Sequence, residues 1–466
     1  MPVTIRSTRA HTDNADTGIR LLEAFFRGAA PDGGLYLPEN LPRLSDEVWD
    51  SRGVRPDFAR LAGNVLEQLF PEDAPTGGWH SLAQRAFPFG PVLRPAGRHL
   101  LLELYHGPTC AFKDFGARFL AQVLESELER RGGSLTILTA TSGDTGSAVG
   151  SAFHGLRNID VVILYPKGRI SKLQQKQLTT LGGNVSAVEV DGAFDDCQSM
   201  VKDMFADTQL SAELRLSSAN SINLGRLIPQ SLYYIWAAAA LRADVQASAA
   251  TTGVEGSRRA DYVGAVPYFT VPSGNFGNLT AGVLAFQSGM PASGFLAATN
   301  LNDVVPHYLR TGHYAPREST ATISNAMDVG TPSNFERLHA MFSGDYRRMG
   351  ALIRGEAIDE DTTRLNIKRY YEEYGLLVCP HTAVGLAAAD RLGTGEYDGG
   401  SVSVVLATAH PGKFSDVVEE ATGRQPDIPE RLQEALDKPG HAVPMPADSR
   451  KLREWLATAG ESRAGR

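Results

Sequence analysis

The sequence predicts an α/β fold in which a mostly parallel sheet is covered by helices on both faces. From about residue 99, short apolar segments alternate with amphipathic segments. The apolar segments include LTILTA (135–140), VVILYP (161–166), VSAVEV (185–190) and PYFTVP (267–272). This alternation is typical of parallel strands joined by crossover helices. A length of 466 residues favours two or three domains over one simple core.

Three regions follow each other along the chain. Residues 1–92 carry helical patches between Pro- and Gly-rich turns and are expected to form an N-terminal domain. Residues 93–428 contain the strand–helix alternation and are expected to form an α/β region of two subdomains, and residues 429–466 a helical C-terminal segment. The small, polar, glycine-containing stretch at 245–262 predicts a surface insertion loop.

The composition has neither a nucleic-acid nor a membrane signature. Apolar residues make up 42% of the chain, and 45 basic against 53 acidic side chains leave a formal charge of -8. This acidic balance lacks the electrostatic footprint of a nucleic-acid-binding protein. The N-terminus has no apolar h-region, and no run approaches the length of about 20 apolar residues that a membrane span needs. We expect a cytoplasmic protein without nucleic acid or membrane as a partner.

Cysteines and histidines give no metal-binding pattern. The cysteines are Cys110, Cys197 and Cys379. Three cysteines in a chain of this length do not form a disulfide scaffold, so we expect them to be reduced and structural. The histidines closest to the sequence motifs are His106, His381 and His410. They lack metal-ligand spacing, and we expect them to stabilise loops first and to carry protons second. The sequence therefore predicts no metal site.

Lys113 is the first candidate for chemistry. It precedes a helical pattern at 114–131, and so lies at a loop-to-helix junction. The positive end of the helix dipole disfavours an ammonium there and favours a neighbouring anion. Both effects suit a lysine that attacks an aldehyde as a neutral amine. The alternative is a surface lysine paired with Asp114, which the flanking aromatic residues Phe112 and Phe115 disfavour.

Two glycine-rich turns each follow a predicted strand and precede a predicted helix. PSGNFGNL (272–279) offers backbone N–H groups that can converge on one anion, although such turns are also common without a ligand. TSGDTGSA (141–148) can bind a second anion by the same physics. Its alternative is a plain helix cap made by Ser142, Asp144 or Thr145.

A third segment, SVSVVLATAHPGKF (401–414), reads as a buried strand that ends in a polar loop. Thr408 is either a functional hydroxyl or an ordinary β-branched strand residue, and Lys413 is either an anion ligand or a solvated loop lysine. The run NSINLGRLIPQ (220–230) presents Asn220, Asn223 and Arg226 before a helix, a pattern usually made by surface charges or caps.

Five segments together carry a family resemblance. HGPTCAFKDFG (106–116), TSGDTGSA (141–148), PSGNFGNL (272–279) and ATAHPGKF (407–414) resemble, in this order, the motifs of threonine synthases of the longer-chain bacterial and fungal branch. DGGLYLPENLP (32–42) is similar to the N-terminal domain of that branch. The resemblance implies pyridoxal-phosphate fold type II, which is tryptophan synthase β-like. This fold has two helix-covered, mostly parallel sheets, here with an added N-terminal threonine-synthase-type domain.

The resemblance also implies pyridoxal 5'-phosphate as the cofactor and a role for each motif. Lys113 forms the Schiff base and acts as the catalytic base, and Thr408 meets the pyridine nitrogen. The cofactor phosphate is held by Gly274, Asn275, Phe276, Gly277 and Asn278. The substrate carboxylate is held by Ser142, Gly143, Asp144 and Thr145. Asp144 would repel that carboxylate and is expected to face the ring or the backbone instead, and Lys413 is a candidate for the substrate phosphate. The run at 220–230 is expected near the cleft.

The implied reaction converts O-phospho-L-homoserine and water to L-threonine and phosphate, the work of a carbon–oxygen lyase acting on phosphates. One alternative keeps the cofactor but releases a 2-oxo acid, as a phospho-lyase or amino-acid dehydratase would. Another alternative is a non-catalytic relative that binds a ligand. Lys113 and the GNFGN run disfavour this alternative. The expected partner is the small-molecule substrate, and the expected assembly is a monomer or a homodimer.

Overall fold

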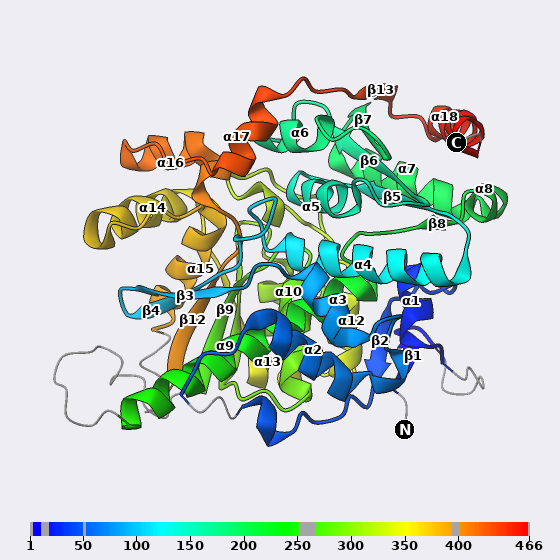
Figure 1. The fold of residues 1–466 in the computed structure, drawn as a ribbon. Coiled ribbons are helices and arrows are strands. Elements are labelled where there is room, and N and C mark those ends of the chain that lie inside the picture. The colour runs from blue at the N-terminus through cyan, green and yellow to red at the C-terminus, as the bar shows by residue number, and fades with distance from the viewer. Residues whose placement is uncertain (1–2, 11–17, 50–52, 251–265, 394–400, 465–466) are drawn as a thin grey trace.

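Two sheets form the frame of the protein. The computed structural model describes residues 3–10, 18–49, 53–250, 266–393 and 401–464. Figure 1 shows the two sheets as separate layers with helices around them and one long helix crossing the middle of the molecule. Most strand pairs in both sheets are parallel, which confirms the predicted fold class.

The larger sheet has six strands in the order β11-β10-β9-β12-β4-β3, and β3 and β4 are its antiparallel pair. Its strands are β3 (Val92–Ala96), β4 (His99–Glu103), β9 (Val266–Pro272), β10 (Gly294–Thr299), β11 (Ile353–Ala357) and β12 (Ser401–Ala407). The smaller sheet has five parallel strands in the order β13-β7-β6-β5-β8. Its strands are β5 (Leu135–Ala140), β6 (Ile159–Pro166), β7 (Val185–Asp191), β8 (Leu216–Ser217) and β13 (Val443–Pro446).

The N-terminal region has its own two-stranded antiparallel sheet of β1 (Thr4–Ser7) and β2 (Tyr36–Glu39). It also contains the helices α1 (Leu21–Arg27), α2 (Phe58–Leu69) and α3 (Gly78–Ala86). The sequence predicted the helical patches but missed both strands, which are only four residues long. A common hydrophobic core joins this region to the rest of the molecule.

Helices cover and connect the sheets. Those of the first half of the α/β region are α4 (Lys113–Arg131), α5 (Asp144–Phe153), α6 (Lys172–Thr179), α7 (Phe194–Ala206), α8 (Thr208–Glu213) and α9 (Leu224–Ala250). Those of the second half are α10 (Gly277–Gln287), α11 (Val304–Thr311), α12 (Phe335–Met341), α13 (Tyr346–Leu352), α14 (Glu360–Tyr374), α15 (Pro380–Arg391) and α16 (Ser415–Thr422). The C-terminal segment adds α17 (Glu430–Asp437) and α18 (Ser449–Ala464). No helix of the described part of the chain is long and apolar enough to cross a membrane.

Helix α4 crosses the middle of the molecule (Figure 1). Its first residue is Lys113. It packs against α5 on the side of the smaller sheet and against α3 and α9 on the side of the larger one. Helices with neighbours on several sides are buried around most of their circumference rather than along one stripe. The position of Lys113 is therefore fixed from both halves of the protein.

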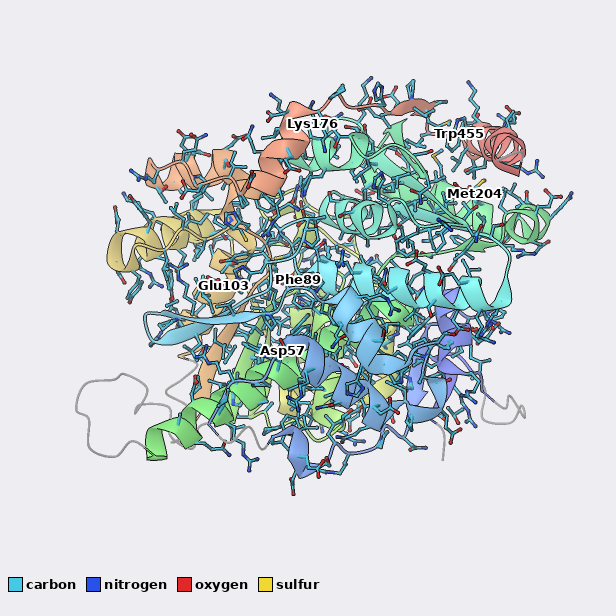
Figure 2. All side chains as sticks on the ribbon, viewed as in Figure 1. Asp57, Phe89, Glu103, Lys176, Met204 and Trp455 are labelled. Atoms are coloured by element: carbon cyan, nitrogen blue, oxygen red, sulfur yellow. The ribbon has the colours of Figure 1, made fainter. Side chains whose placement is uncertain are left out.

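Two predictions about segments need correction. Residues 245–250, predicted as the start of a surface loop, are the last turns of α9, because the alanine-rich sequence continues the helix. The remainder of that stretch lies outside the described residues. The C-terminal segment is not only helical, since β13 adds an edge strand to the smaller sheet. Figure 2 shows the segment's Trp455, on α18, near Met204 of α7, and the two belong to one hydrophobic cluster.

Arg337 joins the N-terminal region to the rest of the molecule. Its fully buried guanidinium donates to the carbonyls of Tyr36 and Ile222 and to Oδ1 of Asn334. Arg337→Met leaves these acceptors unpaired, and we expect a loss of roughly 3–5 kcal/mol in unfolding free energy. Calorimetry should show a clear fall in melting temperature. The matched substitution at exposed Arg348 should leave it almost unchanged, and equal melting temperatures for the two variants would contradict this interpretation.

Candidate active site

A cleft of about 180 Å³ lies where β5, β9 and β12 end. The carboxyl ends of parallel strands are the usual place for a ligand in open α/β sheets. Of the predicted site residues, the cleft is lined by Lys113, Ser142, Asp144, Thr145, Gly274, Asn275, Phe276, Gly277, Asn278 and Thr408. Four motifs distant in sequence thus meet at one place. Gly143 completes the turn between Ser142 and Asp144, and Lys413 lies behind it against Asp144.

Lys113 is held next to Thr408 by the backbone. The N–H of Phe112 donates to the carbonyl of Thr408 over 2.8 Å, and Ala111 and Ala409 form an isolated β-bridge. Burial of the ammonium lowers the pKa of Lys113 to about 8. Near neutral pH, a larger share of Lys113 than of an ordinary lysine is therefore the neutral amine, which is the form that attacks a carbonyl.

Asp114 is not the partner of Lys113. Its Oδ1 accepts from the hydroxyl of Thr109 at 2.7 Å and its Oδ2 from the backbone N–H of Thr109 at 2.9 Å. Burial raises the pKa of this carboxyl above its ordinary value. The alternative interpretation of Lys113 as a surface lysine paired with Asp114 is wrong, because both carboxylate oxygens serve the loop that precedes α4.

The turn 272–279 forms an anion cup at the start of α10. Phe276 adopts a left-handed conformation, with φ 60° and ψ 11°, and the helix begins at the next residue. Asn278 Nδ2 holds the turn closed by donating to the carbonyl of Pro272 over 2.8 Å. The first N–H groups of a helix have no acceptor within it, and the helix dipole adds partial positive charge there. The cup can therefore bind a phosphate.

The turn 141–148 has the same character at the start of α5. Thr141 Oγ1 accepts from the N–H of Gly143 at 2.9 Å and from that of Gly146 at 2.8 Å. Thr141 thus caps this helix, not Ser142, Asp144 or Thr145 as the alternative interpretation held. The N–H groups of Asp144 and Thr145 belong to the first helical turn, so they have no acceptor within α5, and both residues line the cleft. They can bind a second anion.

Asp144 is neutralised by Lys413. Its Oδ1 lies 2.7 Å from Lys413 Nζ and accepts from Gln174 Nε2 at 3.0 Å, and the two charged side chains are 5% and 0% exposed. Burial alone would raise the pKa of Asp144, but the ammonium groups of Lys413 and Lys113 hold it below its ordinary value. Lys413 is not a solvated loop lysine, so that alternative is wrong. Its predicted contact with a substrate gains no support from this geometry.

Arg226 is a site residue whose chemistry the sequence did not reveal. It lines the cleft, is 2% exposed, and its buried Nε has no hydrogen-bond acceptor among the residues that the structure describes. Burial lowers its pKa to about 10, so the guanidinium stays charged at neutral pH. Its Nη1 donates to the carbonyl of Ala219, and its Nε lies against Gly116 of α4. The buried positive charge beside the cleft is therefore the feature of Arg226 that suits an anionic ligand. Asn220 and Ser221 line the cleft next to it, which confirms that the run 220–230 lies there.

The histidines stabilise loops, as predicted. His381 Nε2 accepts from the backbone N–H of Ala326 at 3.2 Å, and burial lowers its pKa to about 4, so it is neutral at pH 7. His410 Nδ1 accepts from the N–H of Gly412 at 3.1 Å. Within the described ranges, no group of three or more potential metal ligands occurs. All three cysteines are buried and free.

Comparison with known proteins identifies the family. A family model described as pyridoxal-phosphate dependent enzyme matches residues 94–409. Models described as threonine synthase N terminus and as threonine synthase, C-terminal, match residues 5–87 and 382–456. The threonine synthase of Escherichia coli (strain K12) is 40% identical over 440 residues, which are 94% of this chain and 96% of that protein. The chain belongs to the threonine synthase family.

Solved threonine synthases share the whole fold. The crystal structure of the Escherichia coli threonine synthase superposes with a TM-score of 0.85 at 37% identity, covering 98% of this chain and 100% of that one. A pyridoxal-phosphate-bound threonine synthase from Brucella melitensis gives a TM-score of 0.83 at 32% identity, covering 98% and 99%. The predicted pyridoxal-phosphate fold type II is therefore confirmed.

The cleft of this threonine synthase family member fits pyridoxal phosphate. Lys113 supplies an amine with a lowered pKa for the aldehyde, the cup at 274–278 supplies N–H groups for the phosphate, and Thr408 brings a hydroxyl into the same cleft. The cup also needs a glycine. A Cβ on Gly274 would lie 2.6 Å from the carbonyl oxygen of Ala326 and 2.9 Å from Cα of Met327.

Gly274→Ala is expected to weaken cofactor binding. Because both atoms that the new methyl meets belong to the backbone, the cup or the facing loop must shift, at a cost of roughly 1–3 kcal/mol. The dissociation constant of pyridoxal phosphate, measured by fluorescence titration, should rise by the corresponding factor of roughly 5–150. Gly350→Ala is a matched control, since the nearest atom to its Cβ is 3.9 Å away. Equal affinities of both variants would show that the cup tolerates the methyl.

Proposed function

We propose that this threonine synthase family member converts O-phospho-L-homoserine and water to L-threonine and phosphate. The observation that carries the proposal is the gathering of Lys113 with three anion-binding groups in one cleft. We assign the cup at 274–278 to the cofactor phosphate, the turn at 142–145 to the substrate carboxylate and Arg226 to the substrate phosphate. Three anionic groups are what this cofactor and substrate bring together.

Each residue of the cleft has a separate role in the proposed reaction. When bound, pyridoxal phosphate supplies an electron sink for the charge that develops at the substrate's α carbon. Lys113 Nζ removes the proton at the α carbon and returns it at the end, and its lowered pKa suits both transfers near neutral pH. Thr408 would offer a neutral hydroxyl to the pyridine nitrogen, and Arg226 would balance the charge of the departing phosphate.

A product balance tests the proposed reaction. The purified protein is incubated with O-phospho-L-homoserine in ¹⁸O-labelled water, and phosphate, threonine and 2-oxobutyrate are quantified together. Equal amounts of phosphate and of threonine labelled at its hydroxyl are expected. Phosphate with 2-oxobutyrate would instead identify the phospho-lyase alternative, which the family membership does not favour. Absence of phosphate release would contradict the substrate assignment.

Other properties stay predictions. These are the cytoplasmic location, the monomeric or homodimeric assembly, and the domain boundaries at 92/93 and 428/429. Family models that end at residue 87 and begin at residue 94 support the first boundary. The model of the C-terminal part begins within the α/β region, at residue 382, and so gives the second boundary no comparable support.

A further inference from the structure

The ammonium of Lys413 is a junction between three segments of the cleft. Lys413 follows β12 of the larger sheet, Asp144 follows β5 of the smaller sheet, and Thr109 belongs to the loop that carries Lys113. Lys413 Nζ lies 2.7 Å from Asp144 Oδ1 and donates to the carbonyl of Thr109 over 2.9 Å. One buried cation thus links both sheets to the lysine-bearing loop.

The pair determines what surrounds Lys113. Within the part of the chain that the structure describes, no ion pair joins Lys113 to a carboxylate, whereas Asp144 is paired with Lys413. The charged groups that act on Lys113 are Asp144, Lys413 and Arg226, and His381 beside them is neutral at pH 7. Asp144 favours the ammonium form of Lys113, and the two cations oppose it.

We propose that Lys413 is a positioning residue that engages the Asp144 carboxylate and thereby favours the neutral amine form of Lys113 that the reaction needs. This inference rests on the proposed function, in which Lys113 reacts with an aldehyde. Lys413 acts through Asp144, without touching the ligands. The Asp144 carboxylate lies in the turn assigned to the substrate carboxylate and would repel it. Pairing with Lys413 compensates the negative charge of Asp144 and so reduces this repulsion.

Stability alone does not explain such a pair. Taking two charges out of water costs about as much as their attraction returns, and an apolar replacement of similar volume is often neutral or stabilising. Removing one member alone leaves the other as an unpaired buried charge. Without Lys413, the cation that still acts on Asp144 is Lys113, whose pKa would then rise.

The test compares Lys413→Met with the double variant Lys413→Met/Asp144→Asn. The full chain is freed of cofactor and mixed with pyridoxal phosphate at a series of pH values, and attachment to Lys113 is trapped with borohydride and quantified by mass spectrometry. For Lys413→Met, the midpoint of the pH profile should move upward by about 1 unit. The double variant also removes the carboxylate that favours the ammonium, so its midpoint should return to the wild-type value or lie below it. Lys413→Arg keeps the positive charge and should keep the wild-type midpoint.

The outcomes separate a positioning role from a structural one. A general loss of packing would slow attachment in both variants without restoring the midpoint in the double variant. An unmoved midpoint in Lys413→Met, or a double variant shifted as far as the single one, would overturn the inference. Should Lys413→Met fail to fold, a double variant whose midpoint lies above the wild-type value would still overturn the inference. Failure of the wild-type chain to attach the cofactor at Lys113 would contradict the proposed function itself.

Discussion

Replacing Lys113 with alanine is expected to abolish covalent attachment of pyridoxal phosphate and nearly all threonine formation. In the proposed function the amine is the nucleophile for the aldehyde and the base at the α carbon, and loss of acid–base catalysis alone costs ~10²–10⁴ in rate. The loss of covalent attachment adds to this figure. The side chain is partly exposed to the cleft, so its truncation should leave the fold intact.

The matched control for Lys113→Ala is Lys202→Ala, on the exposed surface of α7. It should retain the absorbance of the bound cofactor and the full rate of threonine formation. The two variants are compared by absorbance, by cofactor content and by the product balance. Threonine formation by Lys113→Ala at a rate near that of the control would contradict the role of Lys113.

Replacing Arg226 with methionine is expected to weaken the use of substrate without removing the cofactor. Truncating one partner of a buried, charged hydrogen-bonded pair typically costs 2–5 kcal/mol, so kcat/KM should fall by a factor of roughly 30 to 5,000. Methionine keeps most of the buried volume, which limits collapse of the site. Inhibition by inorganic phosphate should weaken in parallel, because the same guanidinium would bind it.

Arg242→Met is the control for Arg226→Met, since Arg242 lies on the same helix α9 but on its exposed surface. Its kcat/KM and phosphate inhibition should equal those of the wild type. Unchanged phosphate inhibition in Arg226→Met would assign the substrate phosphate to another group. Loss of cofactor from Arg226→Met would place Arg226 in the cofactor site instead.

The parts of the site that are local in sequence could be predicted from it. The cups at 141–148 and 272–279 are strand-to-helix turns, and the first N–H groups of any such helix are available to an anion. Lys113 lies at a similar junction. The parallel sheets could also be predicted, because each strand and each helix shows its hydrophobic periodicity within its own segment of the sequence.

The parts that depend on distant residues could not be predicted. The sequence suggested that Asp144 would repel a carboxylate, but nothing near it in the chain indicated that Lys413 would neutralise it. A buried arginine such as Arg226 looks like a surface charge in sequence. The strand β13 contains two prolines and pairs only at the sheet edge, where missing N–H donors are tolerated, so its composition did not indicate a strand.

The central claim is that Lys113 carries the cofactor in the cleft built by the four motifs. The most direct test is to reduce the purified protein with borohydride, digest it and locate the pyridoxyl group by mass spectrometry. The group is expected on the peptide that contains Lys113, in an amount close to one per chain. A pyridoxyl group on Lys413 or on any other lysine, or none at all in a protein that forms threonine, would contradict the account.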